Sequence, residues 1–302
     1  MPTDQQYKIS ASSLNLRSEP IVAPRTLVAT LPHGHPVTKL DEANDANWWR
    51  ISTALQGASV EGFVNRNYLT LASDFTEPPS QRGIRDVHLQ TNDRILRSQT
   101  GGRAFPLNED GRPRRDGTTA ADRAGQLGDI INWLRVDQSR RYLPVGGTTF
   151  CNIYAYDYCY LAGVYLPRVW WTRNAIATLA SGGQVSPQYG TTVTELNANS
   201  IYNWFEEFGA NFGWLRTFDL TVLQDAANAG KVCIINGQRT DLNRPGHICP
   251  VVPEVQSHAA VRRGGAVTTP LQSQAGASNF RYGGRVWWTG AQFRRFAFWV
   301  HG

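Results

Sequence analysis

Short strand-like runs separated by turn residues fill the first 73 residues of the chain. The runs cover residues 14–20, 28–31, 33–37, 47–52, 60–64 and 68–71. Gly, Pro and Asn stand between them, and short runs at this spacing are typical of a small β-barrel. We therefore predict a first, all-β domain over residues 1–73.

A different pattern begins near residue 118. Apolar side chains at Leu127, Ile130, Ile131 and Leu134 have helical spacing and predict a helix within residues 120–140. Further helices are expected at 151–162, 171–179, 194–208 and 220–229, the last capped by Asp219. Strand-like runs follow at 231–236, 247–252, 266–274 and 294–300. Helices followed by strands with short connections predict an α+β domain over residues 118–302.

Residues 74–117 lie between these two patterns. The stretch is rich in Pro, Gly, Arg, Asp and Ser. Such a composition predicts an extended linker with little structure of its own.

The net charge of the chain is +6, carried almost entirely by arginine. A basic balance favours an anionic partner such as nucleic acid, a membrane surface or a cell-wall polymer. The arginines are scattered, without a basic helix, which argues against nucleic acid. No run approaches the roughly 18 apolar residues of a membrane helix, and the N-terminus shows no signal peptide. We expect a monomer that stays in the cytoplasm until it is released or exported by a non-classical route.

The four cysteines lie in the second half of the chain. None forms a Cys-x-x-Cys pair, so we expect no zinc or other metal site and no cofactor. Cys151 and Cys159 share one expected helix and stand about 12 Å apart along its axis, too far for a disulfide. Cys233 and Cys249 sit in apolar runs, which predicts buried free thiols.

Cys151 is the candidate nucleophile. It ends a Gly-containing polar loop and starts an expected helix, where unsatisfied N–H groups and the helix dipole stabilise a thiolate. His247 stands at the entrance of a later strand, so the pair predicts a cysteine hydrolase with a thiolate–imidazolium ion pair. The backbone N–H of Cys151 is a natural oxyanion donor, and Tyr142 is a candidate second donor. Asp157 is expected on the surface of the same helix.

The first domain resembles the bacterial SH3-like family. The resemblance rests on Leu14-Asn-Leu-Arg-Ser-Glu-Pro20, Asn47-Trp-Trp-Arg-Ile-Ser52, Val60-Glu-Gly-Phe-Val64 and the closing Tyr68-Leu69. It implies a barrel that binds peptidoglycan or positions a catalytic domain. A packing module without a ligand is the alternative.

The second domain resembles the NlpC-type and CHAP-type branches of the papain-like superfamily. Three features carry the resemblance: Tyr142 and Gly146-Gly147 ahead of Cys151, the helix–Gly–strand passage at 223–235, and Gly246-His247-Ile248. After the cysteine, Tyr154-Ala155 matches the CHAP pattern Cys-x-x-Tyr/Phe-Ala, whereas NlpC proteins usually have Asp-Cys-Ser-Gly. The resemblance implies helices packed on an antiparallel sheet, and cleavage of peptide or amide bonds in peptidoglycan.

The third catalytic residue is expected on the strand after His247, where it would orient the imidazole. Gln274 is chosen because it resembles the polar end of that strand in CHAP domains. Glu254 and His258 are the alternatives, and an NlpC-like spacing would favour His258.

Trp170 and Trp171 follow the expected nucleophile helix and are candidates for lining a groove that binds a sugar or stem peptide.

The leading interpretation is a peptidoglycan hydrolase acting in the periplasm or cell wall. It could be a phage lysin, or an antibacterial effector with an immunity protein as its partner. A non-catalytic wall-binding or scaffold protein, and an acyltransferase or transglutaminase using the same residues, are the alternatives.

Overall fold

The computed structural model describes residues 5–11, 13–32, 34–45, 47–55, 58–75 and 83–302. The chain divides into two compact units, residues 1–81 and 82–302, which are described separately below. None of the helices in the described part of the chain is long and apolar enough to span a lipid bilayer.

The first unit is a seven-stranded antiparallel sheet with the strand order β3-β2-β6-β5-β4-β1-β7. Its strands are β1 (Gln6–Ile9), β2 (Ser13–Arg17), β3 (Leu27–Pro32), β4 (Pro36–Glu42), β5 (Trp48–Leu55), β6 (Ala58–Asn65) and β7 (Leu69–Leu71). The predicted all-β character is confirmed. Among the described residues no pairing joins β3 to β7, so strand pairing does not close the predicted small barrel. His33, in one of the predicted runs, lies outside the described residues.

Alternation along the strands builds the core of this unit. Fully buried side chains come from five strands, namely Ile9, Leu16, Leu31, Ile51 and Val64. Gly62 sits where β6 passes close to β2, because a Cβ there would lie 2.6 Å from the carbonyl oxygen of Arg17. The Gly-Phe-Val motif therefore reflects a close approach of two strands.

The helices of the second unit are α1 (Ala120–Leu134), α2 (Cys151–Leu161), α3 (Arg173–Ala180), α4 (Ala198–Phe208) and α5 (Leu220–Asn228). Side-chain caps fix where several of them begin. Thr119 forms a capping box with Asp122, and Asp219 caps α5 as predicted. Thr172 and Asn197 cap α3 and α4, so these helices start after the short strands β8 (Val169–Trp171) and β9 (Val193–Glu195).

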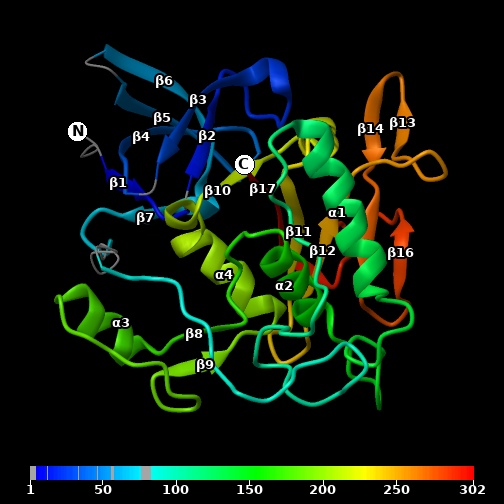
Figure 1. The fold of residues 1–302 in the computed structure, drawn as a ribbon. Coiled ribbons are helices and arrows are strands. Elements are labelled where there is room, and N and C mark those ends of the chain that lie inside the picture. Colours follow the sequence, from blue (N-terminus) through cyan, green and yellow to red (C-terminus); the bar gives the residue numbers. More distant parts are fainter. Residues whose placement is uncertain (1–4, 12, 33, 46, 56–57, 76–82) are drawn as a thin grey trace. The chain divides into compact units, whose positions relative to one another are not determined.

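The main sheet of this unit is antiparallel, with the order β10-β17-β11-β12-β15-β16. Its strands are β10 (Trp214–Thr217), β11 (Val232–Arg239), β12 (His247–Val251), β15 (Gln272–Gln274), β16 (Phe280–Gly283) and β17 (Phe293–His301). A separate hairpin pairs β13 (Val261–Arg263) with β14 (Ala266–Thr269). Helices packed on an antiparallel sheet confirm the predicted α+β class (Figure 1).

The central strand β11 is covered on both faces. Val232 and Ile234 belong to the cluster that holds the buried side chains of α1, α2 and α4. Cys233 and Ile235 point to the other face and pack with α5. A strand buried on both faces needs a continuous apolar run, which is what residues 232–235 supply.

Residues 83–117 contain neither helix nor strand, yet they belong to the second unit. Val87, Leu89, Ile95 and Leu107 are buried in the same core cluster as α1 and α2. Isolated apolar residues in a Pro- and Arg-rich stretch have no period, so the sequence alone predicts a linker here. Residues 76–82 lie outside the described residues, but the stretch from 83 onward is an integral layer of this unit and not a free connector.

Candidate functional site

The loop that precedes α2 provides no side-chain cap for the N-terminus of this helix. Gly146 and Gly147 have φ of 56° and 78°, which lets residues 145–148 form a tight turn. The N-cap residue Phe150 provides no side-chain hydrogen bond to the helix. The helix start therefore has no side-chain cap, and the first N–H groups, those of Cys151 and Asn152, bind the Cys151 thiol.

Cys151 lines a pocket of about 300 Å³. Asn152 and the preceding turn form one wall, and Gly246, ahead of β12, forms another. The charged side chains Arg103, Arg168 and Glu195 also line the pocket. Arg168 pairs with Glu195, and Arg103 stacks on the Phe150 ring at 3.6 Å.

The thiol of Cys151 is bound to β12. It accepts a hydrogen bond from the backbone N–H of Ile248, the residue after His247, and α2 packs against this strand. Only 4% of Cys151 is exposed, and burial raises the pKa of its thiol above the ordinary value. The lowered pKa predicted from the helix N-terminus is therefore wrong for this structure, because desolvation outweighs the backbone hydrogen bonds.

His247 is held at the start of β12 by two neighbours. Asn236 donates from its amide nitrogen to the carbonyl oxygen of His247 at 3.2 Å. Gly246 cannot be larger, since a Cβ there would lie 2.5 Å from Oδ1 of Asn199. These contacts explain why the Gly-His pair enters the strand at this point.

Gln274 orients the imidazole of His247. Its amide nitrogen donates to the carbonyl oxygen of Ser278 at 3.0 Å, so its Oε1 must face the ring. The 3.0 Å contact between Oε1 and Nε2 is then a hydrogen bond donated by the imidazole. This assignment leaves Nδ1 as the basic nitrogen.

The imidazole is neutral at pH 7. Solvent reaches part of the residue, but Trp287 packs edge-on against the ring at 4.5 Å. Burial lowers the pKa of His247 to about 4, although the hydrogen bond to Gln274 opposes the shift. Among the described residues no hydrogen bond joins the thiol of Cys151 to His247. The predicted ion pair is thus absent, and both groups rest uncharged.

The alternation of β12 explains this separation. Ile248 packs in the cluster that contains α2, whereas Cys249 packs in the cluster that contains α5. His247 has the same parity as Cys249, and its neighbour Trp287 packs against that second cluster. The thiol of Cys151 is bound at Ile248, the residue next to His247, whereas His247 has the parity of the opposite face of the sheet.

The other two candidates for the third role lie elsewhere. Glu254 accepts hydrogen bonds from Arg262 and Asn228, and these bonds lower the pKa of its carboxyl group to about 2. His258 bonds to the hydroxyl of Ser257 and stacks on a tyrosine ring. Gln274 is the one among the three that contacts His247.

The aromatic residues expected to bind substrate are in the interior. Trp170 packs with Trp204, and Trp171 donates from its indole nitrogen to a backbone carbonyl oxygen at 2.9 Å. Tyr142 is fully buried and donates to the carboxylate of Asp157 at 2.9 Å. None of the three lines the pocket at Cys151, so the structure gives them a packing role in place of a groove or an oxyanion contact.

Asp157 is fully buried on α2 itself, where we expected a carboxylate on the surface of the helix. Arg141 binds it through two nitrogens, at 2.6 and 3.2 Å. Burial lowers the pKa of Arg141 but the facing carboxylate raises it, and burial raises the pKa of Asp157; the two short contacts between the groups identify them as an ion pair. This network ties the loop before Cys151 to α2, and no spacing in the sequence signals it.

Comparison with known proteins gives little to add to this geometry. No protein-family model and no curated protein matches the chain. Among solved structures, NlpC2 from Trichomonas vaginalis is 11% identical with a TM-score of 0.24, covering 98% of this chain and 71% of that one. NlpC1 from the same organism is 12% identical with a TM-score of 0.23, covering 98% and 68%.

Proposed function

We propose that this protein is a cysteine hydrolase that cleaves peptide or amide bonds in bacterial peptidoglycan. The observation that carries the proposal is the arrangement around Cys151. Cys151 lies at a helix N-terminus without a side-chain cap and lines a pocket. Its thiol is hydrogen-bonded to β12, the strand that begins with His247, and His247 is hydrogen-bonded to Gln274.

The reaction begins with a neutral thiol and a neutral imidazole. As the thiol attacks the substrate carbonyl carbon, Nδ1 of His247 takes the thiol proton and an S–C bond forms. The carbonyl oxygen becomes an oxyanion, which the backbone N–H of Cys151, bound to the thiol in the resting protein, then binds. This step requires the imidazole to approach the thiol, a contact that commonly tightens only when substrate is bound.

Collapse of this intermediate releases the amine. The imidazolium returns its proton to the leaving nitrogen, the C–N bond breaks, and an acyl-enzyme remains on Cys151. His247 then takes a proton from water, the resulting hydroxide attacks the thioester, and the acid product leaves as the thiol is restored. Gln274 stabilises the imidazolium at both stages because its oxygen accepts the Nε2–H.

Charge supports a wall substrate. The chain carries a net charge of +6, and the pocket at Cys151 is lined by Arg103 as well as by the Arg168–Glu195 ion pair. Wall polymers are anionic, so a basic surface favours association with them. Within the proposal the protein acts in the periplasm or cell wall as a monomeric lysin or exported effector, and the SH3-like assignment of the first unit stays a prediction.

Digestion of purified sacculi tests the activity. The wild-type protein should release free amino groups, Cys151→Ala should release none, and Cys159→Ala, a second cysteine on α2, should retain activity. Mass spectrometry of the muropeptides identifies the cleaved bond. Full release by Cys151→Ala would refute the thiol mechanism, and new cross-links in place of free amines would indicate a transferase.

A non-catalytic wall-binding protein is the second candidate, favoured by the missing hydrogen bond between Cys151 and His247. Sedimentation of the protein with sacculi, without any release of amino groups, would support it.

A further inference from the structure

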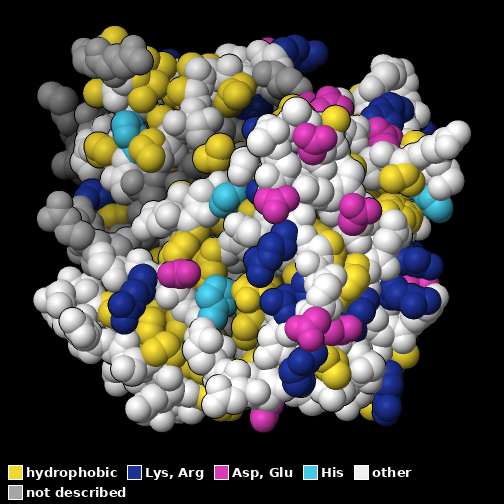
Figure 2. Space-filling model, in the orientation of Figure 1, with side chains coloured by type: hydrophobic (Ala, Val, Ile, Leu, Met, Phe, Trp, Pro, Cys, Tyr) yellow, Lys and Arg dark blue, Asp and Glu magenta, His cyan; other side chains and the backbone are white. Residues whose placement is uncertain are grey.

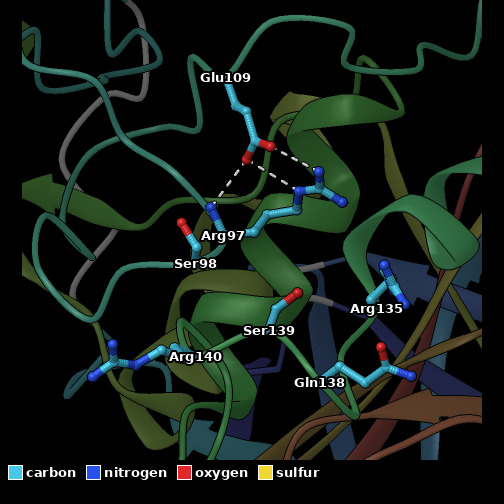
Figure 3. Close-up of a pocket in the computed structure, with 7 residues that line it drawn as sticks. All are labelled: Arg97, Ser98, Glu109, Arg135, Gln138, Ser139 and Arg140. Atoms are coloured by element: carbon cyan, nitrogen blue, oxygen red, sulfur yellow. Dashed lines mark hydrogen bonds and ion pairs between the residues drawn. The ribbon is translucent and has the colours of Figure 1, made fainter.

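A second pocket of about 300 Å³ lies away from Cys151 (Figure 3). It forms between the segment that carries Arg97 and Glu109 and the loop that follows α1. That loop contributes Arg135 and Arg140. The lining is therefore rich in arginine. On the face of the molecule shown in Figure 2, basic side chains gather with acidic ones interspersed.

The acidic group of this pocket is already neutralised. Oε2 of Glu109 accepts hydrogen bonds from the backbone N–H and Nε of Arg97, both at 3.1 Å, and Oε1 accepts from Nη2 at 2.7 Å. Arg97 also stacks on the Trp133 ring at 3.5 Å. This pair is fixed in place and contributes no net charge.

Two guanidinium groups of this pocket remain available to bind a ligand. Arg135 and Arg140 are exposed, and no acidic side chain in the described part of the chain pairs with either. Three arginines against one glutamate leave the lining with a net charge of +2. Because the glutamate oxygens are occupied, the free polar groups of the pocket are predominantly hydrogen-bond donors.

The backbone at Arg135 adds an independent observation. It has φ 47° and ψ 54°, and it is the non-glycine residue with positive φ among those the structure describes. Glycine or asparagine is the usual residue for such a helix end. Arg135 lines the pocket, although its left-handed backbone conformation is disfavoured for an arginine.

The loop is also held in one conformation before any ligand arrives. The N–H groups of Gln138 and Ser139 both donate to the carbonyl oxygen of Arg135 at 2.8 Å. The N–H of Arg141 donates to the carbonyl oxygen of Arg97 at 3.1 Å, joining the two walls of the pocket. A site fixed in this way loses little conformational entropy on binding.

We propose that this pocket binds the phosphate group of a small ligand. A phosphate monoester carries a charge of about −1.5 to −2 at pH 7 and three acceptor oxygens. It therefore matches a donor-lined pocket of charge +2, and guanidinium groups bind phosphate oxygens in a forked geometry. The volume is at the small end of ligand pockets, which suits a phosphorylated molecule of modest size.

Calorimetric titration of the full chain at low salt tests the proposal, with phenyl phosphate, inorganic phosphate and benzoate as probes. Phenyl phosphate should bind. Arg135→Gly and Arg140→Gln should each weaken binding about tenfold or more, as expected for the loss of a charge-assisted hydrogen bond. Inorganic phosphate distinguishes a site for the free ion from one that needs the organic group.

Two controls separate ligand binding from folding and from general charge. Glycine tolerates the backbone of residue 135, so the Tm of Arg135→Gly should equal or exceed that of the wild type. Arg263→Gln removes an exposed arginine that does not line the pocket, and it should bind as the wild type does. Equal binding by the wild type and both pocket variants, no binding of either phosphate probe, or benzoate binding as tightly as phenyl phosphate would each overturn the proposal.

Discussion

Replacing Gln274 by alanine should slow the reaction and leave the fold intact. The side chain accepts the Nε2–H of His247 at 3.0 Å, and its own amide is held by Ser278. A hydrogen bond to a charged group contributes about 1.5–3 kcal/mol. Since a tenfold rate change corresponds to about 1.4 kcal/mol, we expect kcat/KM to fall about 10- to 150-fold.

The loss should fall on kcat more than on KM. The imidazole is neutral in the resting protein and charged only while the reaction proceeds, so the bond to Gln274 is stronger in the transition state. Release of amino groups from sacculi, measured against substrate concentration, gives both constants. Gln274→Glu should retain more activity, because a carboxylate accepts the same hydrogen; it should also raise the pKa of His247 above about 4.

Glu254→Gln and His258→Ala are matched controls, since neither residue contacts His247 in the structure. Both should keep wild-type kcat/KM. A Gln274→Ala variant within twofold of the wild type, or a control variant that loses as much activity, would refute the assignment of the third role.

Three further predictions follow from burial. Because the pKa of His247 is about 4 in the folded state and about 6.5 when unfolded, the unfolded chain binds more protons between these values. Stability should therefore fall as the pH drops from 6.5 to 4, and urea titrations of His247→Asn should show a weaker dependence; an identical dependence contradicts the shift. Asp157→Asn should lower the free energy of unfolding by about 3–5 kcal/mol, as expected when a buried ion pair loses one partner, and a loss below 1 kcal/mol would contradict an ionised Arg141. Alkylation of Cys151 by iodoacetamide should be faster than that of the other three cysteines and should rise steadily between pH 6 and 8, whereas a flat rate would indicate a resting ion pair.

Local signals made the nucleophile region predictable from the sequence. A glycine-containing loop ahead of Cys151, an apolar run after it, and the cap at Asp219 each act over a few residues, and the structure has α2 and α5 where these signals placed them. The contact of Gln274 with His247 agrees with the choice that the resemblance to CHAP domains implied, whereas strand order alone left Glu254 and His258 open.

The ionisation states were not predictable in the same way. The pKa of His247 depends on enclosure by Trp287, forty residues further along the chain, and that of Cys151 on packing against β12. Trp170 and Trp171 show the same limit, since an aromatic pair in a sequence does not reveal whether it faces a groove or the interior.

The layer formed by residues 83–117 determines where the chain can be divided for truncation or gene fusion. Arg115 donates to the carbonyl oxygens of Ala162 and Gly230, and Arg103 donates to that of Arg141. A fragment starting at residue 118 would lack these contacts and four buried apolar side chains. Gene fusion, recombination or expression of the second unit alone should therefore place its junction before residue 83, where exchange of the first unit leaves the interior of the second complete.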